Sequence, residues 1–141
     1  MTDQIQPIVE YPKRNEMLDH AILTVSNIEV SVAFYEAALK PLSIKFLAPY
    51  KGSDGHPDLW GFGTGKNIFF WLKHGKPHPE AIHLGFVAES NDVVDAFYKA
   101  SIAAGAKENI SPRARIEYYP GYYAADVFDP DGYSFEAVHK N

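Results

Sequence analysis

An internal repeat is the feature that most constrains the fold of this chain. The segment from Leu18 and the segment from Ala81 align without a gap at a constant shift of 63 residues, which pairs His20 with His83. The same shift pairs Ala-Phe-Tyr at 33–35 with Ala-Phe-Tyr at 96–98. Each copy has the pattern of a strand with a histidine near its start, a polar break and an amphipathic helix. The repeat therefore predicts two equivalent structural modules.

Each copy also contains the pattern of three further strands. In the first copy, Ser26 and Glu29 resemble a capping box at the start of a helix that Pro41 stops. The expected elements are a strand at 18–25, a helix to about 39, and strands at 44–50, 58–62 and 68–72.

The second copy repeats this order, with Ser90 or Asn91 as the helix cap and Gly105 as the C-terminal cap. Asp129-Pro-Asp-Gly132 predicts a hairpin turn between its last two strands. The expected elements are a strand at 82–88, a helix to about 104, a strand-like piece within 111–119, and strands at 122–128 and 133–138. The predicted class is α+β, with the order βαβββ followed by βαβββ.

The chain of 141 residues predicts one domain after an N-terminal arm. Residues 1–16 are polar, with few apolar side chains to bury, so we expect an arm there and a single domain over 17–141. The segment 73–80 is rich in proline and histidine and has linker composition. Module one is therefore expected at about 17–73 and module two at about 81–140.

Composition narrows the classes of function. The net charge is −5 and there is no basic run, which argues against nucleic acid or an anionic membrane as the partner. Cysteine is absent, so any metal must be held by nitrogen and oxygen ligands. Neither a signal-like segment nor an apolar run of membrane length is found, so we expect a cytoplasmic protein that acts on a small molecule.

The duplicated strand Leu18-Asp-His-Ala-Ile-Leu-Thr-Val25 and the ending Asp129-Pro-Asp-Gly-Tyr-Ser-Phe-Glu136 resemble the vicinal oxygen chelate superfamily. This superfamily includes glyoxalase I, bleomycin and fosfomycin resistance proteins, and extradiol dioxygenases. The resemblance implies modules whose curved sheets form a cleft with a divalent metal at its floor. By position, the implied ligands are His20, His83 and Glu136, with Glu136 also a catalytic candidate. The resemblance further implies a homodimer.

Two imidazoles and one carboxylate suit a divalent first-row metal such as Fe, Zn, Ni or Mn, and the residues do not select among them. Three protein ligands leave coordination positions open for a substrate with two adjacent oxygens. The competing interpretation is that the histidines are structural, the glutamate is solvated, and the symmetry is a relic of duplication without a metal.

The chain departs from named relatives at two points. Glyoxalase I has a fourth ligand on the last strand of its first module, and here Phe69 stands opposite Glu136 in the repeat. Phe69 and Trp71 are therefore candidates for the wall of an apolar pocket or for core packing. Extradiol dioxygenases add a histidine upstream of the final turn, where this chain has tyrosines. Tyr122 and Tyr123 are candidates for substrate contact.

Arg113 and Arg115 are the candidates for binding an anionic substrate group. The sequence thus predicts a divalent-metal-dependent enzyme acting on a small metabolite, and a lyase or isomerase is favoured over ring cleavage because the upstream histidine is missing. Two alternatives stay open. One is a metal-free small-ligand-binding protein of the bleomycin-resistance type, and the other is an extradiol-type dioxygenase. Whether the modules pair within one chain or between two chains is also open.

Overall fold

A computed structural model describes residues 18–141, and the predicted arm lies outside the described residues. The first module carries a helix and a short 3₁₀ turn among four strands. Its elements are β1 (Ala21–Val25), α1 (Ile28–Leu39), η1 (Lys40–Leu42), β2 (Lys45–Tyr50), β3 (Leu59–Thr64) and β4 (Asn67–His74).

The second module repeats this order after the 3₁₀ turn η2 (Pro79–Ala81). Its elements are β5 (His83–Val87), α2 (Asn91–Ala103), β6 (Lys107–Ala114), β7 (Tyr122–Phe128) and β8 (Ser134–Lys140). The predicted α+β class and the doubled βαβββ order are confirmed.

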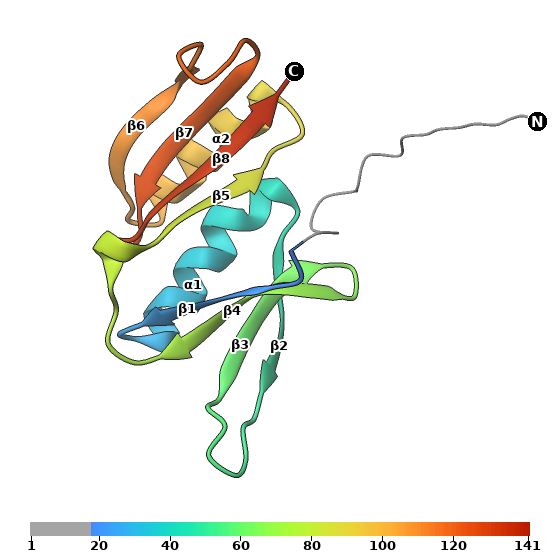
Figure 1. Cartoon of the computed structure of the whole chain (residues 1–141), viewed down its shortest axis with the longest axis vertical. Helices are drawn as coiled ribbons and strands as arrows, with labels where there is room; N and C mark the ends of the chain where they lie inside the picture. Colours follow the sequence, from blue (N-terminus) through green and yellow to red (C-terminus); the bar gives the residue numbers. More distant parts are fainter. Residues whose placement is uncertain (1–17) are drawn as a thin grey trace, which may run out of the picture.

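The strands form two separate four-stranded sheets, in the orders β1-β4-β3-β2 and β5-β8-β7-β6 (Figure 1). In each sheet the first strand of the module pairs in parallel with the last, and the other pairs are antiparallel. In each module the helix connects the first strand to the second. The chain then runs through the middle strands, and the last strand returns beside the first. Among the described residues, no helix is long and apolar enough to span a membrane.

The helix caps differ from the prediction in the first module. Asn27, not Ser26, caps α1, because its side chain accepts a hydrogen bond from the backbone N–H of Val30. Ser26 is instead engaged by Asp131 of the second module, which accepts from both its backbone N–H and its hydroxyl. In the second module Ser90 caps α2, as one of the two predicted alternatives.

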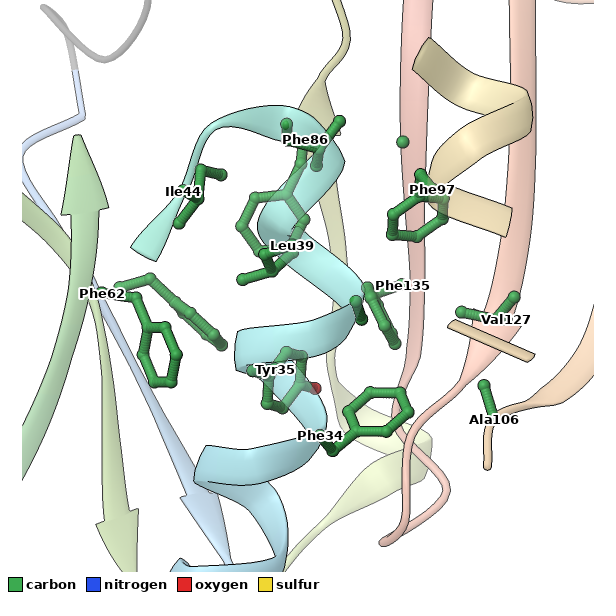
Figure 2. Packing of buried hydrophobic residues seen from close by; sticks show 14 of the residues in the cluster. Phe34, Tyr35, Leu39, Ile44, Phe62, Phe86, Phe97, Ala106, Val127 and Phe135 are labelled. Carbon is green, nitrogen blue, oxygen red and sulfur yellow. The ribbon is translucent and has the colours of Figure 1, made fainter. Parts of the chain in front are cut away.

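A core rich in aromatic rings joins the two modules around α1 (Figure 2). Tyr35 on α1 lies with its ring centroid 5.2 Å from that of Phe70 in the first sheet and 5.3 Å from that of Phe135 in the second. Phe86 on β5 also contacts both rings, at 5.5 and 6.3 Å. The shared core therefore lies between the faces of the two sheets that pack against the helices. The opposite face of the second sheet carries the candidate functional site.

The Asp129-Pro-Asp-Gly turn connects the second module to the first. The buried Asp129 accepts a hydrogen bond of 2.6 Å from the hydroxyl of Tyr35, and the hydroxyl of Tyr133 donates to the carbonyl of Thr24 at 2.6 Å. Asp129 also accepts from the backbone N–H groups of Asp131 and Tyr133, which fixes the turn itself. The turn thus holds the start of β8 in place against α1 and β1.

Strand β6 differs from the sequence-based expectation. It begins at Lys107, directly after the turn at Gly105, and it ends at Ala114, whereas the prediction placed a strand-like piece within 111–119. Two irregularities interrupt its pairing with β7, between Glu108 and Ile110 and between Ile110 and Arg113. Irregular pairing obscures the alternation of apolar and polar residues from which a strand is predicted.

Candidate metal centre

The second sheet has two chemically different faces. On β7, Ala125 and Val127 are buried in the core, and the hydroxyl of Tyr123 donates to Asp95 of α2 at 2.7 Å. Because side chains alternate along a strand, Asp126 points to the other face. Its cross-strand neighbour on β8 is Glu136, which therefore lies on that same face.

Three potential ligands gather on this face. One ligand atom from each of His83, Asp126 and Glu136 lies within 4.8 Å of the others. Nε2 of His83 is 2.7 Å from Oε1 of Glu136. The two carboxylates are nearly buried, with 6% of Asp126 and 7% of Glu136 exposed, while the histidine is open to solvent. The group is therefore accessible from one side.

Two neighbouring hydroxyls orient this group. Oγ of Ser134 lies 2.9 Å from Nδ1 of His83, so the second ring nitrogen is occupied and Nε2 faces the carboxylates. The hydroxyl of Tyr122 donates to Oε2 of Glu136 at 2.7 Å. Burial, followed by the bond to Glu136, raises the pKa of Tyr122 well above its ordinary value, so this phenol keeps its proton at neutral pH.

Asp126 is paired with the buried Arg115, whose Nη2 donates to Oδ1 of the carboxylate. Burial raises the pKa of Asp126, the bond from Arg115 opposes this, and the nearby charge of Glu136 adds to the rise. Nε of Arg115 is buried and has no hydrogen-bond partner among residues 18–141. The guanidinium thus pairs with Asp126, beside the second nearly buried carboxylate of Glu136.

The group fits a divalent metal by its donor types and spacing. A metal with bonds of about 2.1 Å places neighbouring ligand atoms about 3 Å apart, close to the 2.7 Å between His83 and Glu136. Nitrogen and carboxylate oxygen suit Zn, Fe, Mn and Ni alike. A ring nitrogen held from behind, as Ser134 holds Nδ1 of His83, is also usual for a ligating histidine. These residues are therefore competent to hold the metal expected from the sequence.

The structure brings together two of the three predicted ligands and separates the third. His83 and Glu136 are in contact, but His20 is not a member of this group within residues 18–141. Its Nδ1 lies 2.6 Å from Oδ1 of Asp19. With Phe69, His20 lines a cavity of about 400 Å³ between the first module and β5, to which β5 contributes residues 84–87.

The predicted substrate-contact residues also divide. Tyr122 lies at the group, whereas Tyr123 points to α2 on the opposite face of the sheet. Arg113 is exposed, and its guanidinium donates to Glu117 at 3.0 Å. Trp71 is half-buried beside Gly61 on the first sheet, away from the group of His83 and Glu136.

Sequence reasoning missed Asp126. A signal for Asp126 was present, because the hairpin turn at 129–132 sets Phe128 opposite Ser134 and thus Asp126 opposite Glu136. Arg115 was predicted as a candidate for binding an anionic substrate group, and in the structure it is buried and donates to Asp126.

Two βαβββ modules, with a histidine and two carboxylates on an open sheet face, define a paired-module protein with a candidate metal centre. The family model of the Glyoxalase/Bleomycin resistance protein/Dioxygenase superfamily matches residues 17–137, and the chain belongs to this superfamily. A search of curated proteins gives no match.

Solved structures agree with this assignment. A glyoxalase/bleomycin resistance protein from Albidiferax ferrireducens T118 is 28% identical, with a TM-score of 0.72 over 89% of this chain and 100% of that one. The fosfomycin resistance protein FosX from Mesorhizobium loti is 18% identical, with a TM-score of 0.62 over 86% and 90%. A glyoxalase I mutant from Zea mays is 18% identical, with a TM-score of 0.63 over 85% and 43%. The last two show a shared fold.

Proposed function

We propose that this protein is a divalent-metal-dependent enzyme that acts on a small metabolite binding the metal through two adjacent oxygens. The observation that carries the proposal is the contact of His83 with Glu136 on one open sheet face, where Nε2 and Oε1 are 2.7 Å apart. Family membership supports it, because the names of similar proteins include a glyoxalase I and a fosfomycin resistance protein. Among reaction types, a lyase or isomerase is preferred to ring cleavage.

The chain's own residues define what the site does. When bound, a divalent metal supplies a Lewis acid for an oxygen of the substrate. Glu136 is the candidate base, since its carboxylate lies at the open face beside His83. Tyr122, whose hydroxyl donates to Oε2 of Glu136, holds this carboxylate in place beside His83.

A second copy of the chain is the proposed source of His20. On the first sheet, His20 and the exposed Ile22 share a face by strand alternation, and on the second sheet His83 and the exposed Val87 do the same. Exposed apolar side chains on both faces favour association. If these faces meet between two copies, His20 of one copy approaches His83 of the other. The proposal is therefore a homodimer with a site at the interface.

A rival function has one observation in its favour. The hydrogen bonds from His83 and Tyr122 already satisfy both oxygens of Glu136 without a metal. A metal-free small-ligand-binding protein of the bleomycin-resistance type would use the same open face. A dioxygenase that used Tyr122 is a second rival.

Metal binding separates these functions. The protein is purified without chelator, its metal content is measured, and Mn²⁺, Zn²⁺, Ni²⁺ and Fe²⁺ are titrated by calorimetry. We expect one tight site per chain that His83→Ala abolishes and that the control His56→Ala, in the exposed loop before β3, leaves intact. Acetohydroxamate, which chelates through two adjacent oxygens, should bind only the metal-loaded protein. Absence of metal binding in the wild type would support the metal-free rival.

A further inference from the structure

We propose that Asp126 is itself a metal ligand, so that the second module of a single chain holds the metal through His83, Asp126 and Glu136. This inference rests on the proposed metal dependence. It assigns a role to a residue that the sequence-based ligand set of His20, His83 and Glu136 did not contain. In this assignment, His20 of the proposed second copy is an added ligand that metal binding does not require.

Asp126 lies on the same sheet face as Glu136. It stands directly opposite Glu136 in the antiparallel pair of β7 and β8, and directly opposed residues project their side chains to the same face about 5 Å apart. Glu136 is in turn the parallel neighbour of Gly85 on β5, which has no side chain to intervene. The three ligand atoms within 4.8 Å of one another come from three adjacent strands of one sheet.

The negative charge of the two carboxylates also favours a bound cation. Asp126 and Glu136 are both more than nine-tenths buried and lie side by side, which is costly unless positive charge compensates both. Arg115 supplies one positive charge, and His83 is accessible to solvent. A histidine that ligates a metal is neutral, so the two carboxylates and one guanidinium then carry a net charge of −1. A divalent cation between the carboxylates compensates this charge.

Arg115 acts as a positioning residue for the carboxylate of Asp126. Its backbone N–H donates to the carbonyl of Tyr122 at 2.7 Å, which fixes it beside β7. Its Nη2 occupies Oδ1 of Asp126, and a carboxylate has a second oxygen with which to bind a metal. The ion pair thus holds the carboxylate at the group.

The test uses the absence of cysteine from this chain. In Asp126→Cys, a thiolate at position 126 within the metal's coordination sphere gives Co²⁺ a thiolate-to-metal charge-transfer band in the near ultraviolet. The matched control is Asp95→Cys, on α2 at the opposite face of the same sheet. We expect the band in Asp126→Cys and no band in the control or the wild type.

Affinity for Co²⁺ provides a second readout that does not depend on the new thiol. Asp126→Asn should weaken binding by at least about 100-fold, the upper end of what residues outside the coordination sphere usually contribute. His20→Ala should weaken binding less than Asp126→Asn does. Circular dichroism checks that each variant is folded.

The outcomes separate the two proposals. If the wild type binds Co²⁺ and His83→Ala does not, but Asp126→Cys gives no band and Asp126→Asn binds like the wild type, the role of Asp126 is refuted and the metal-dependent function stands. If the wild type binds no Co²⁺, both proposals are refuted. A larger loss for His20→Ala than for Asp126→Asn would also overturn the single-chain site.

Discussion

Replacing Tyr35 by phenylalanine tests how the two modules are held together. The variant removes one hydroxyl from a fully buried ring and deprives Asp129 of a donor at 2.6 Å. Asp129 keeps the two backbone donors on its other oxygen, so one bond to a buried carboxylate is lost. A hydrogen bond to a charged group contributes about 1.5–3 kcal/mol, so we expect a loss of about 2 kcal/mol in the free energy of unfolding.

The assay is thermal and urea denaturation followed by circular dichroism. For a chain of this size, 2 kcal/mol corresponds to a fall in Tm of about 7 °C. The matched control is Tyr98→Phe, which removes a hydroxyl that donates to Glu108 at the surface and should lower Tm much less than Tyr35→Phe does. Equal small losses in both variants would refute the inference that the Asp129 turn fastens the second module to α1.

Three further predictions address pH dependence, metal affinity and packing. Burial raises the pKa of Asp129 above the ordinary 3.8, so the folded chain binds more protons than the unfolded one. The free energy of unfolding should therefore fall as pH rises from about 4 through the raised pKa. The difference in this free energy between wild type and Asp129→Asn should shrink over that window, and a growing difference would contradict this sign. Ser134→Ala frees Nδ1 of His83 and should weaken metal binding by about 10- to 100-fold, which calorimetry measures; unchanged affinity would show that Ser134 does not orient the ring. Gly63→Ala would place a Cβ 1.8 Å from the carbonyl oxygen of Asn67 and should lower the free energy of unfolding by about 3 kcal/mol or more. In Gly85→Ala the nearest atom to the new Cβ is 3.6 Å away, so the loss should be less than about 1 kcal/mol. Similar Tm values for the two variants would contradict the close approach at Gly63.

The sequence was most informative where local pattern and repetition agree. The repeat and the alternating strands predicted the doubled βαβββ order, because each copy carries its own strand and helix periods. The prediction was wrong for the first helix cap, where Ser26 is occupied by Asp131. A residue 105 positions away in the chain provides that bond, and a local capping pattern does not reveal it.

The candidate site shows the same division. Glu136 and His83 lie on the adjacent parallel strands β8 and β5 of one module, two residues apart in register, and their side chains are in contact. His20 occupies the equivalent position in the other module, but equivalence within a repeat does not determine how two sheets are arranged. In this chain His20 lines a cavity that is also lined by Gly85 and Val87 of β5, but within residues 18–141 it is not a member of the group of His83, Asp126 and Glu136. In the proposed homodimer, His20 of the second copy would approach His83.

The most direct test of the metal centre is a crystal structure of the protein grown with Mn²⁺, in which anomalous scattering locates the ion. The account predicts one anomalous peak per chain, about 2.0–2.3 Å from Nε2 of His83 and from carboxylate oxygens of Asp126 and Glu136. If the map instead shows the hydrogen bond between His83 and Glu136 intact and no peak on this face of the second sheet, the metal centre is contradicted.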